Sequence, residues 1–139
     1  MRKRLNAEHL TLGVCYYPEH WDSGMWRDDL RRMREIGVEV VRIAEFAWNK
    51  LEPTEGHFTF DFFDTFMDMT VEEGIKVIFC TPSATPPMWM CEKYPEILNA
   101  AIDGDLIYPG TRRHANLNSE KYRYFCERIT EKIAAHYGK

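Results

Sequence analysis

The stretch from Val38 to Trp48 places the strongest constraint on how this chain folds. It reads Val-Glu-Val-Val-Arg-Ile-Ala-Glu-Phe-Ala-Trp, and its near-continuous apolar run predicts a parallel strand that is covered on both faces. Arg42 and Glu45 interrupt the run near its carboxyl end. Because a charge taken out of water costs several kcal/mol unless it is paired or hydrogen-bonded, these two residues need a local explanation. Two interpretations stay open: a structural Arg42–Glu45 pair that fixes strand register, and a functional site at the strand end.

Strand and helix patterns alternate along the chain. Strands are expected at 12–15, 38–44 and 76–80, and helices from Asp22 or Ser23 to about Glu35, Asp61 to Gly74, Met88 to Tyr94, and near Ser119 to Gly138. The apolar faces of these helices are expected to include Ile36 in the first, Val71 in the second, and Tyr122, Phe125, Ile129 and Ile133 in the last. Gly37 and Gly74 suit the end of the first two helices. A loop is expected after Trp48, and the stretch 96–117 shows no sustained period and is expected to be structureless.

Three strand-helix units in a row fit either part of an eightfold barrel or a small doubly wound sheet. A nucleotide-binding doubly wound sheet needs a glycine-rich turn after its first strand, whereas this chain has Tyr16-Tyr-Pro-Glu-His-Trp21. We therefore expect an α/β fold that is the N-terminal portion, about three β/α units, of a TIM (β/α)8 barrel.

Composition narrows the class of protein. A hydrophobic fraction of 45%, a charged fraction of 29% and a net charge of -4 are typical of a soluble globular protein, and the dispersed basic residues argue against a nucleic-acid partner. The start Met1-Arg-Lys-Arg is followed by polar residues where a signal peptide needs an apolar run, and the apolar runs are too short for a membrane span. We expect a cytoplasmic protein with no membrane association. The four scattered cysteines fit reduced thiols rather than disulfides or a structural zinc site.

Three carboxylates, Glu19, Glu45 and Glu52, lie near strand ends. Paired carboxylates perform glycosidic bond cleavage, but surface glutamates are common and the solvated interpretation is favoured for Glu19 and Glu52. Glu45 is the exception because it is embedded at the apolar strand end, where its best local role is to pair with Arg42.

A basic cluster, Arg112-Arg113-His114, precedes the last helix. A planar guanidinium holds two substrate oxygens at once, and the alternative is a solvated basic loop. The histidines His20, His57 and His114 share no ligand spacing, so no metal site is expected. Trp89 is expected to pack, although its ring also suits a binding face.

Several motifs, taken together and in order, resemble glycoside hydrolase family 42, the β-galactosidases. The matching stretches are Leu12-Gly-Val-Cys-Tyr-Tyr-Pro-Glu-His-Trp21, Val41-Arg-Ile-Ala-Glu-Phe-Ala-Trp48 with Leu51-Glu-Pro, Thr81-Pro-Ser-Ala-Thr-Pro-Pro87 with Trp89, Tyr94-Pro-Glu-Ile-Leu98 and Arg112-Arg-His114. The resemblance covers nearly the whole chain beyond residue 11.

The resemblance implies a (β/α)8 barrel that hydrolyses terminal non-reducing β-D-galactose residues with retention of configuration. Arg42 and Arg112 match the family's galactose-contacting arginines. The family's acid/base glutamate ends the fourth strand and its nucleophile comes later, so both are expected beyond Lys139. Residues 1–11 are then an N-terminal arm and 12–139 a partial catalytic barrel, inactive alone. The alternative is a non-catalytic galactoside-binding module.

The resemblance also bears on metals, cofactors and assembly. Some members bind a structural zinc through cysteines, and the first of these positions is Asn116 here, so no metal is expected. No cofactor is expected either. Family members are commonly trimers, which makes the intact protein an expected homotrimer with a small-molecule β-galactoside as substrate.

Overall fold

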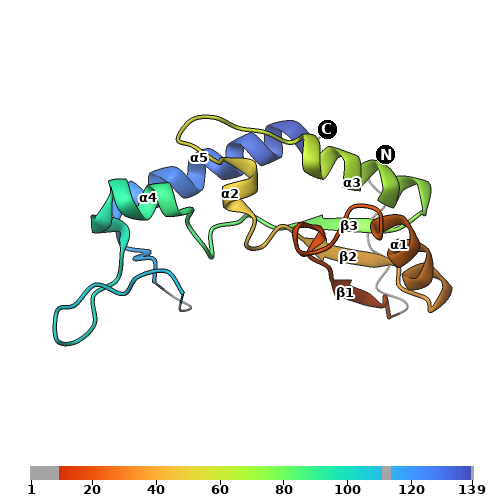
Figure 1. The fold of residues 1–139 in the computed structure, drawn as a ribbon, viewed down its shortest axis with the longest axis horizontal. Coiled ribbons are helices and arrows are strands. Elements are labelled where there is room, and N and C mark those ends of the chain that lie inside the picture. Colours follow the sequence, from red (N-terminus) through yellow and green to blue (C-terminus); the bar gives the residue numbers. More distant parts are fainter. Residues whose placement is uncertain (1–9, 111–113, 139) are drawn as a thin grey trace. The chain divides into compact units, whose positions relative to one another are not determined.

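The structure is a computed structural model that describes residues 10–110 and 114–138 (Figure 1). The described residues form two compact units. The first lies within Met1–Ile43 and Phe63–Ile78, and the second within Ala44–Phe62 and Phe79–Lys139. In the part of the chain that is described, no helix is both long and apolar enough to cross a bilayer.

The first unit is built on a three-stranded sheet. Its strands are β1 (Gly13–Cys15), β2 (Val40–Ile43) and β3 (Lys76–Phe79), in the order β1-β2-β3. The parallel register of β1 and β2 pairs Gly13 with Val40, Val14 with Val41 and Cys15 with Arg42. Three parallel strands in sequential order, each connected to the next through a helix, confirm the expected α/β class.

Two helices, α1 (Trp26–Glu35) and α3 (Asp61–Glu72), connect these strands. The Trp26 and Phe66 rings meet edge to face with centroids 5.5 Å apart, and Tyr16 stacks on Phe66 at 5.6 Å. These three aromatic side chains are buried. The predicted apolar helix faces thus form the core that positions β2.

The second unit contains the remaining helices. They are α2 (Trp48–Leu51), α4 (Met88–Lys93), the short 3-10 helix η2 (Pro95–Ile97) and α5 (Glu120–Tyr137). The other 3-10 helix, η1 (Pro18–His20), belongs to the first unit. The last helix agrees closely with the sequence pattern. Its N-cap Ser119 accepts a hydrogen bond from the Tyr122 amide, and its buried residues are the four expected ones, Tyr122, Phe125, Ile129 and Ile133.

Three local predictions are wrong. Helix α1 begins at Trp26 without a side-chain cap, because the Asp22 carboxylate instead accepts from the Gly24 amide in a turn. The second strand covers Val40–Ile43 rather than 38–44, and a short helix, α2, lies where a loop was expected after Trp48. Ile36 and Val71, both expected on apolar helix faces, are 73% and 75% exposed.

Strand β2 buries one face more than the other. Val41 and Ile43 are fully buried, whereas the alternate residues Val40 and Arg42 are half-buried. The neighbouring strand residues Gly13 and Cys15, which pair with Val40 and Arg42, are exposed. Because successive strand residues point to opposite faces, the face that carries Arg42 is the less covered one, and the expected burial on both faces is not found among the described residues.

Candidate functional site

A strained turn follows β2 directly. Ala44 adopts a positive φ of 67°, a conformation that non-glycine residues rarely adopt outside functional or tightly constrained positions. The Ala47 amide donates to the Ala44 carbonyl at 3.2 Å, so Glu45 and Phe46 occupy the two central positions of a turn. The turn presents a half-buried carboxylate and an aromatic ring that is 39% exposed.

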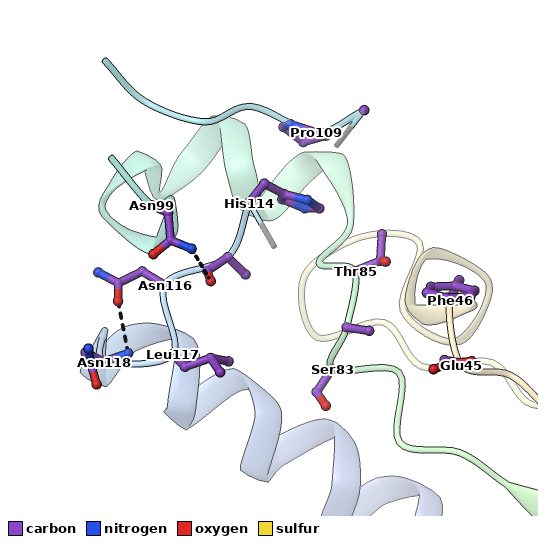
Figure 2. Close-up of a pocket in the computed structure, with 13 residues that line it drawn as sticks. Glu45, Phe46, Ser83, Thr85, Asn99, Pro109, His114, Asn116, Leu117 and Asn118 are labelled. Carbon is purple, nitrogen blue, oxygen red and sulfur yellow. Dashed lines mark hydrogen bonds between the residues drawn. The ribbon is translucent and has the colours of Figure 1, made fainter. Parts of the chain in front are cut away.

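This turn borders a pocket of about 810 Å³ (Figure 2). The loop after β3 supplies Ser83, Ala84 and Thr85, and a later segment supplies residues 114–118 together with Asn99. The lining combines hydroxyl, carboxamide, imidazole and carboxylate groups with apolar surface, a mixture that suits a polar organic ligand such as a sugar.

The segment from residue 114 to 118 forms a well-bonded wall of this pocket. Its Leu98–Ala115 bridge is antiparallel, and the Asn99 amide donates to the His114 carbonyl at 2.7 Å. The Asn99 carboxamide also donates to the Ala115 carbonyl at 2.9 Å, as the dashed line in Figure 2 shows. The stretch expected to be structureless, 96–117, is therefore held by local pairing where it meets the pocket.

The two predicted substrate-binding arginines are not tested by these contacts. Arg42 lies in β2, where its Nη1 is 3.5 Å from Cys15 Sγ. Arg112 falls outside the described residues, as does Arg113. Their role remains a prediction, and so does the pairing of Arg42 with Glu45.

Glu52 is a structural carboxylate rather than a solvated one, which corrects the sequence-based interpretation. Its side chain is fully buried and forms an ion pair with Arg128 of α5. Its Oε2 accepts from Trp48 Nε1 at 2.9 Å and its Oε1 accepts from the Gly56 amide at 2.8 Å. Both oxygens are occupied inside the second unit, so Glu52 is not available as a catalytic carboxylate.

Trp89 packs as expected, and it also donates a hydrogen bond to Glu52. Its indole Nε1 donates to the Glu52 backbone carbonyl at 2.9 Å, and its ring meets Phe125 edge to face at 5.7 Å. No local pattern links Arg128 to Glu52 across 76 positions, and this partner was missed from the sequence. The sequence signal that bears on Glu52 is Trp48, which lies one helical turn before it and donates to its carboxylate.

The remaining candidates, Glu19 and the three histidines, differ in how far they are buried. Both carboxylate oxygens of Glu19 are buried, so the solvated interpretation is wrong for Glu19 as well. His114 is buried and lines the pocket, whereas His20 and His57 are exposed. Among the described residues, no group of three His, Cys, Asp or Glu side chains is placed to hold a metal ion. The pocket residues Phe46, Ser83, Asn99 and Asn118 were not predicted from the sequence, since single residues in loops give no periodic signal.

Comparison with known proteins identifies the family of this chain. The sequence profile of glycoside hydrolase family 42, described as beta-galactosidase, matches residues 15–139. The chain belongs to glycoside hydrolase family 42. The family assignment agrees with the resemblance carried by the motifs around Arg42 and Thr81.

Individual relatives support the family assignment. The chain is 46% identical over 127 residues to a beta-galactosidase of Thermus thermophilus, covering 91% of this chain and 20% of that protein. The structure matches the beta-galactosidase of Halorubrum lacusprofundi with a TM-score of 0.87 at 41% identity, covering 92% of this chain and 19% of the other.

A second solved structure, Gan42B, is a family 42 beta-galactosidase that matches with a TM-score of 0.89 at 30% identity, covering 96% of this chain and 20% of the other. A catalytic glutamate-to-alanine mutant of Gan42B matches equally well. This chain thus spans about a fifth of the length of the relatives that it matches and corresponds to their N-terminal part.

Proposed function

We propose that this chain forms the N-terminal part of the catalytic barrel of a β-galactosidase, with residues 12–139 in the barrel and 1–11 as an arm. The family match over residues 15–139 carries the proposal. The position of the pocket supports it, because the pocket is lined by the loops that follow β2 and β3. Barrel enzymes build their sites from the loops at the carboxyl ends of their strands.

The chemistry would be divided between this chain and the rest of the barrel. Arg42 and Arg112 would bind the galactose hydroxyls of a terminal β-galactoside, because a guanidinium donates two parallel hydrogen bonds. A retaining mechanism requires two carboxyl groups about 5 to 5.5 Å apart. Glu52 is excluded by its buried ion pair, and we assign the acid/base and the nucleophile to glutamates beyond Lys139. This reaction needs no cofactor.

A chimera tests this proposal. In it, residues 1–139 replace the corresponding N-terminal segment of the Thermus thermophilus relative, which is 46% identical to this chain. We expect the chimera to hydrolyse nitrophenyl β-galactoside. A chimera that folds and assembles like the parent enzyme but has no activity above a host-free blank would contradict the proposal.

The two arginines give a sharper prediction within the chimera. Arg42→Ala and Arg112→Ala should each lower kcat/KM for nitrophenyl galactoside by about 10- to 100-fold, the factor expected for a lost charge-assisted hydrogen bond. The matched control is Arg123→Ala, since Arg123 is exposed on α5 and should leave kcat/KM unchanged. Unchanged kinetics in either test variant removes that arginine from the site.

The pocket supports a second candidate function, that of a non-catalytic galactoside-binding module. Half a sugar site should bind weakly, because much of the enclosing wall is contributed by other parts of a barrel. Titration of the chain with galactose by NMR separates the two functions. Shifts at the pocket residues, combined with an inactive chimera, would favour the module. The absence of shifts at tens of millimolar in a monomeric chain with a dispersed spectrum would remove it, and a chain that does not fold alone would also count against a free-standing module.

We also propose that the intact protein is a cytoplasmic homotrimer. Sedimentation of the full-length gene product tests the assembly directly. A monomer at micromolar concentration would contradict it.

A further inference from the structure

The first turn of α5 connects to both walls of the pocket within the second unit. One wall, residues 114–118, leads directly into α5 through its N-cap Ser119. The other wall is the Ser83–Thr85 loop, and the Tyr122 hydroxyl donates to the Ser83 carbonyl at 2.5 Å. A single side chain on the first turn of α5 therefore joins two segments that are 39 residues apart in sequence.

The Ser83–Thr85 wall depends on this hydrogen bond because its own backbone offers few others. Pro82, Pro86 and Pro87 flank it and have no amide hydrogen to donate. The internal backbone bond of the loop runs from the Thr85 amide to the Pro82 carbonyl at 3.3 Å, close to the upper limit for such a bond. The Ser83 carbonyl instead accepts the tyrosine hydroxyl.

Tyr122 is suited to act as a fixed support. Its side chain is fully buried, and its ring lies against Trp48 with centroids 6.1 Å apart. Its amide is bonded to the Ser119 side chain at 3.3 Å. Burial raises the pKa of the Tyr122 hydroxyl well above its usual range, so the hydroxyl keeps its proton and donates at every pH at which an enzyme works.

We infer that the Tyr122 hydroxyl is a positioning group that sets the spacing between the two walls of the pocket and thereby the fit of the sugar bound there. This inference rests on the proposed function for the identity of the ligand. It concerns a residue that acts through Ser83 and does not itself line the pocket.

The test compares Tyr122→Phe with Tyr124→Phe in the chimera. Both changes remove one hydroxyl from α5, but Tyr124 is 57% exposed. For Tyr122→Phe we expect KM for nitrophenyl galactoside to rise by about three- to tenfold, and the free energy of one ordinary hydrogen bond sets the upper end of that range because Tyr122 acts on the sugar only through the wall. KM does not depend on how much enzyme is folded, so a purely structural loss would leave it unchanged. Tyr124→Phe should keep the parent KM.

A second readout does not need activity. Hydrogen-deuterium exchange at the Thr85 amide, which donates to the Pro82 carbonyl inside the loop, should be at least several-fold faster in the Tyr122→Phe chimera than in the Tyr124→Phe chimera, because the wall loses its support. If the parent chimera is inactive, the proposed function fails while the exchange result still decides whether Tyr122 holds the wall. Unchanged exchange, or faster exchange with an unchanged KM in an active chimera, overturns the inference.

Discussion

Glu52→Ala is expected to be one of the two most damaging changes, costing about 3–5 kcal/mol of folding stability in the chimera. The substitution leaves Arg128, which is 19% exposed, without its carboxylate partner. It also removes the acceptor for the Trp48 indole and for the Gly56 amide. Breaking a buried pair from one side costs more than the pair contributes, because the remaining charge stays buried.

Thermal inactivation of the chimera measures this loss. The Glu52→Ala protein should either fail to accumulate in soluble form or lose activity at a clearly lower temperature than the parent. Glu55→Ala is the matched control three residues away. Glu55 is exposed and pairs with Lys93, which lowers the pKa of its carboxyl, and solvent screening makes such surface pairs weak. Equal inactivation temperatures for the two variants would contradict the structural role of Glu52.

The second large effect concerns the chain by itself. Expressed alone, residues 1–139 should fold poorly or self-associate and should show no galactosidase activity. Strands β1 and β3 are the two edges of the sheet, and unpaired edges expose backbone groups that a closed barrel satisfies. Ile78 of β3 is 50% exposed, and the side chains that fill a barrel centre come from strands all the way round.

Ultracentrifugation, thermal unfolding and an activity assay test this expectation together. A monomer with a cooperative thermal transition and no binding of dyes to apolar surface would refute the folding part. Turnover of nitrophenyl galactoside by a preparation free of host β-galactosidase would refute the catalytic part.

Sequence patterns predicted the periodic parts of this fold well. The spacing of Tyr122, Phe125, Ile129 and Ile133 gave the buried face of α5, and Gly37 and Gly74 adopt the left-handed conformation expected after α1 and α3. These features are local, since each follows from residues within a few helical turns.

The parts that were missed depend on contacts between distant segments. The burial of Glu52 is explained by Arg128, and the position of the Ser83 loop by Tyr122. Neither partner is signalled by spacing, because a tertiary ion pair or a single hydrogen bond to a carbonyl leaves no period in the sequence. The short helix α2 was also missed, because its four residues are too few to show helical periodicity.

We propose that this chain supplies the galactose-binding arginines of a β-galactosidase whose catalytic glutamates lie elsewhere in the barrel. A crystal structure of the chimera with bound galactose measures this most directly. We expect galactose hydroxyls to lie within hydrogen-bond distance of the guanidinium groups of Arg42 and Arg112. An ordered galactose with neither arginine within that distance would contradict it.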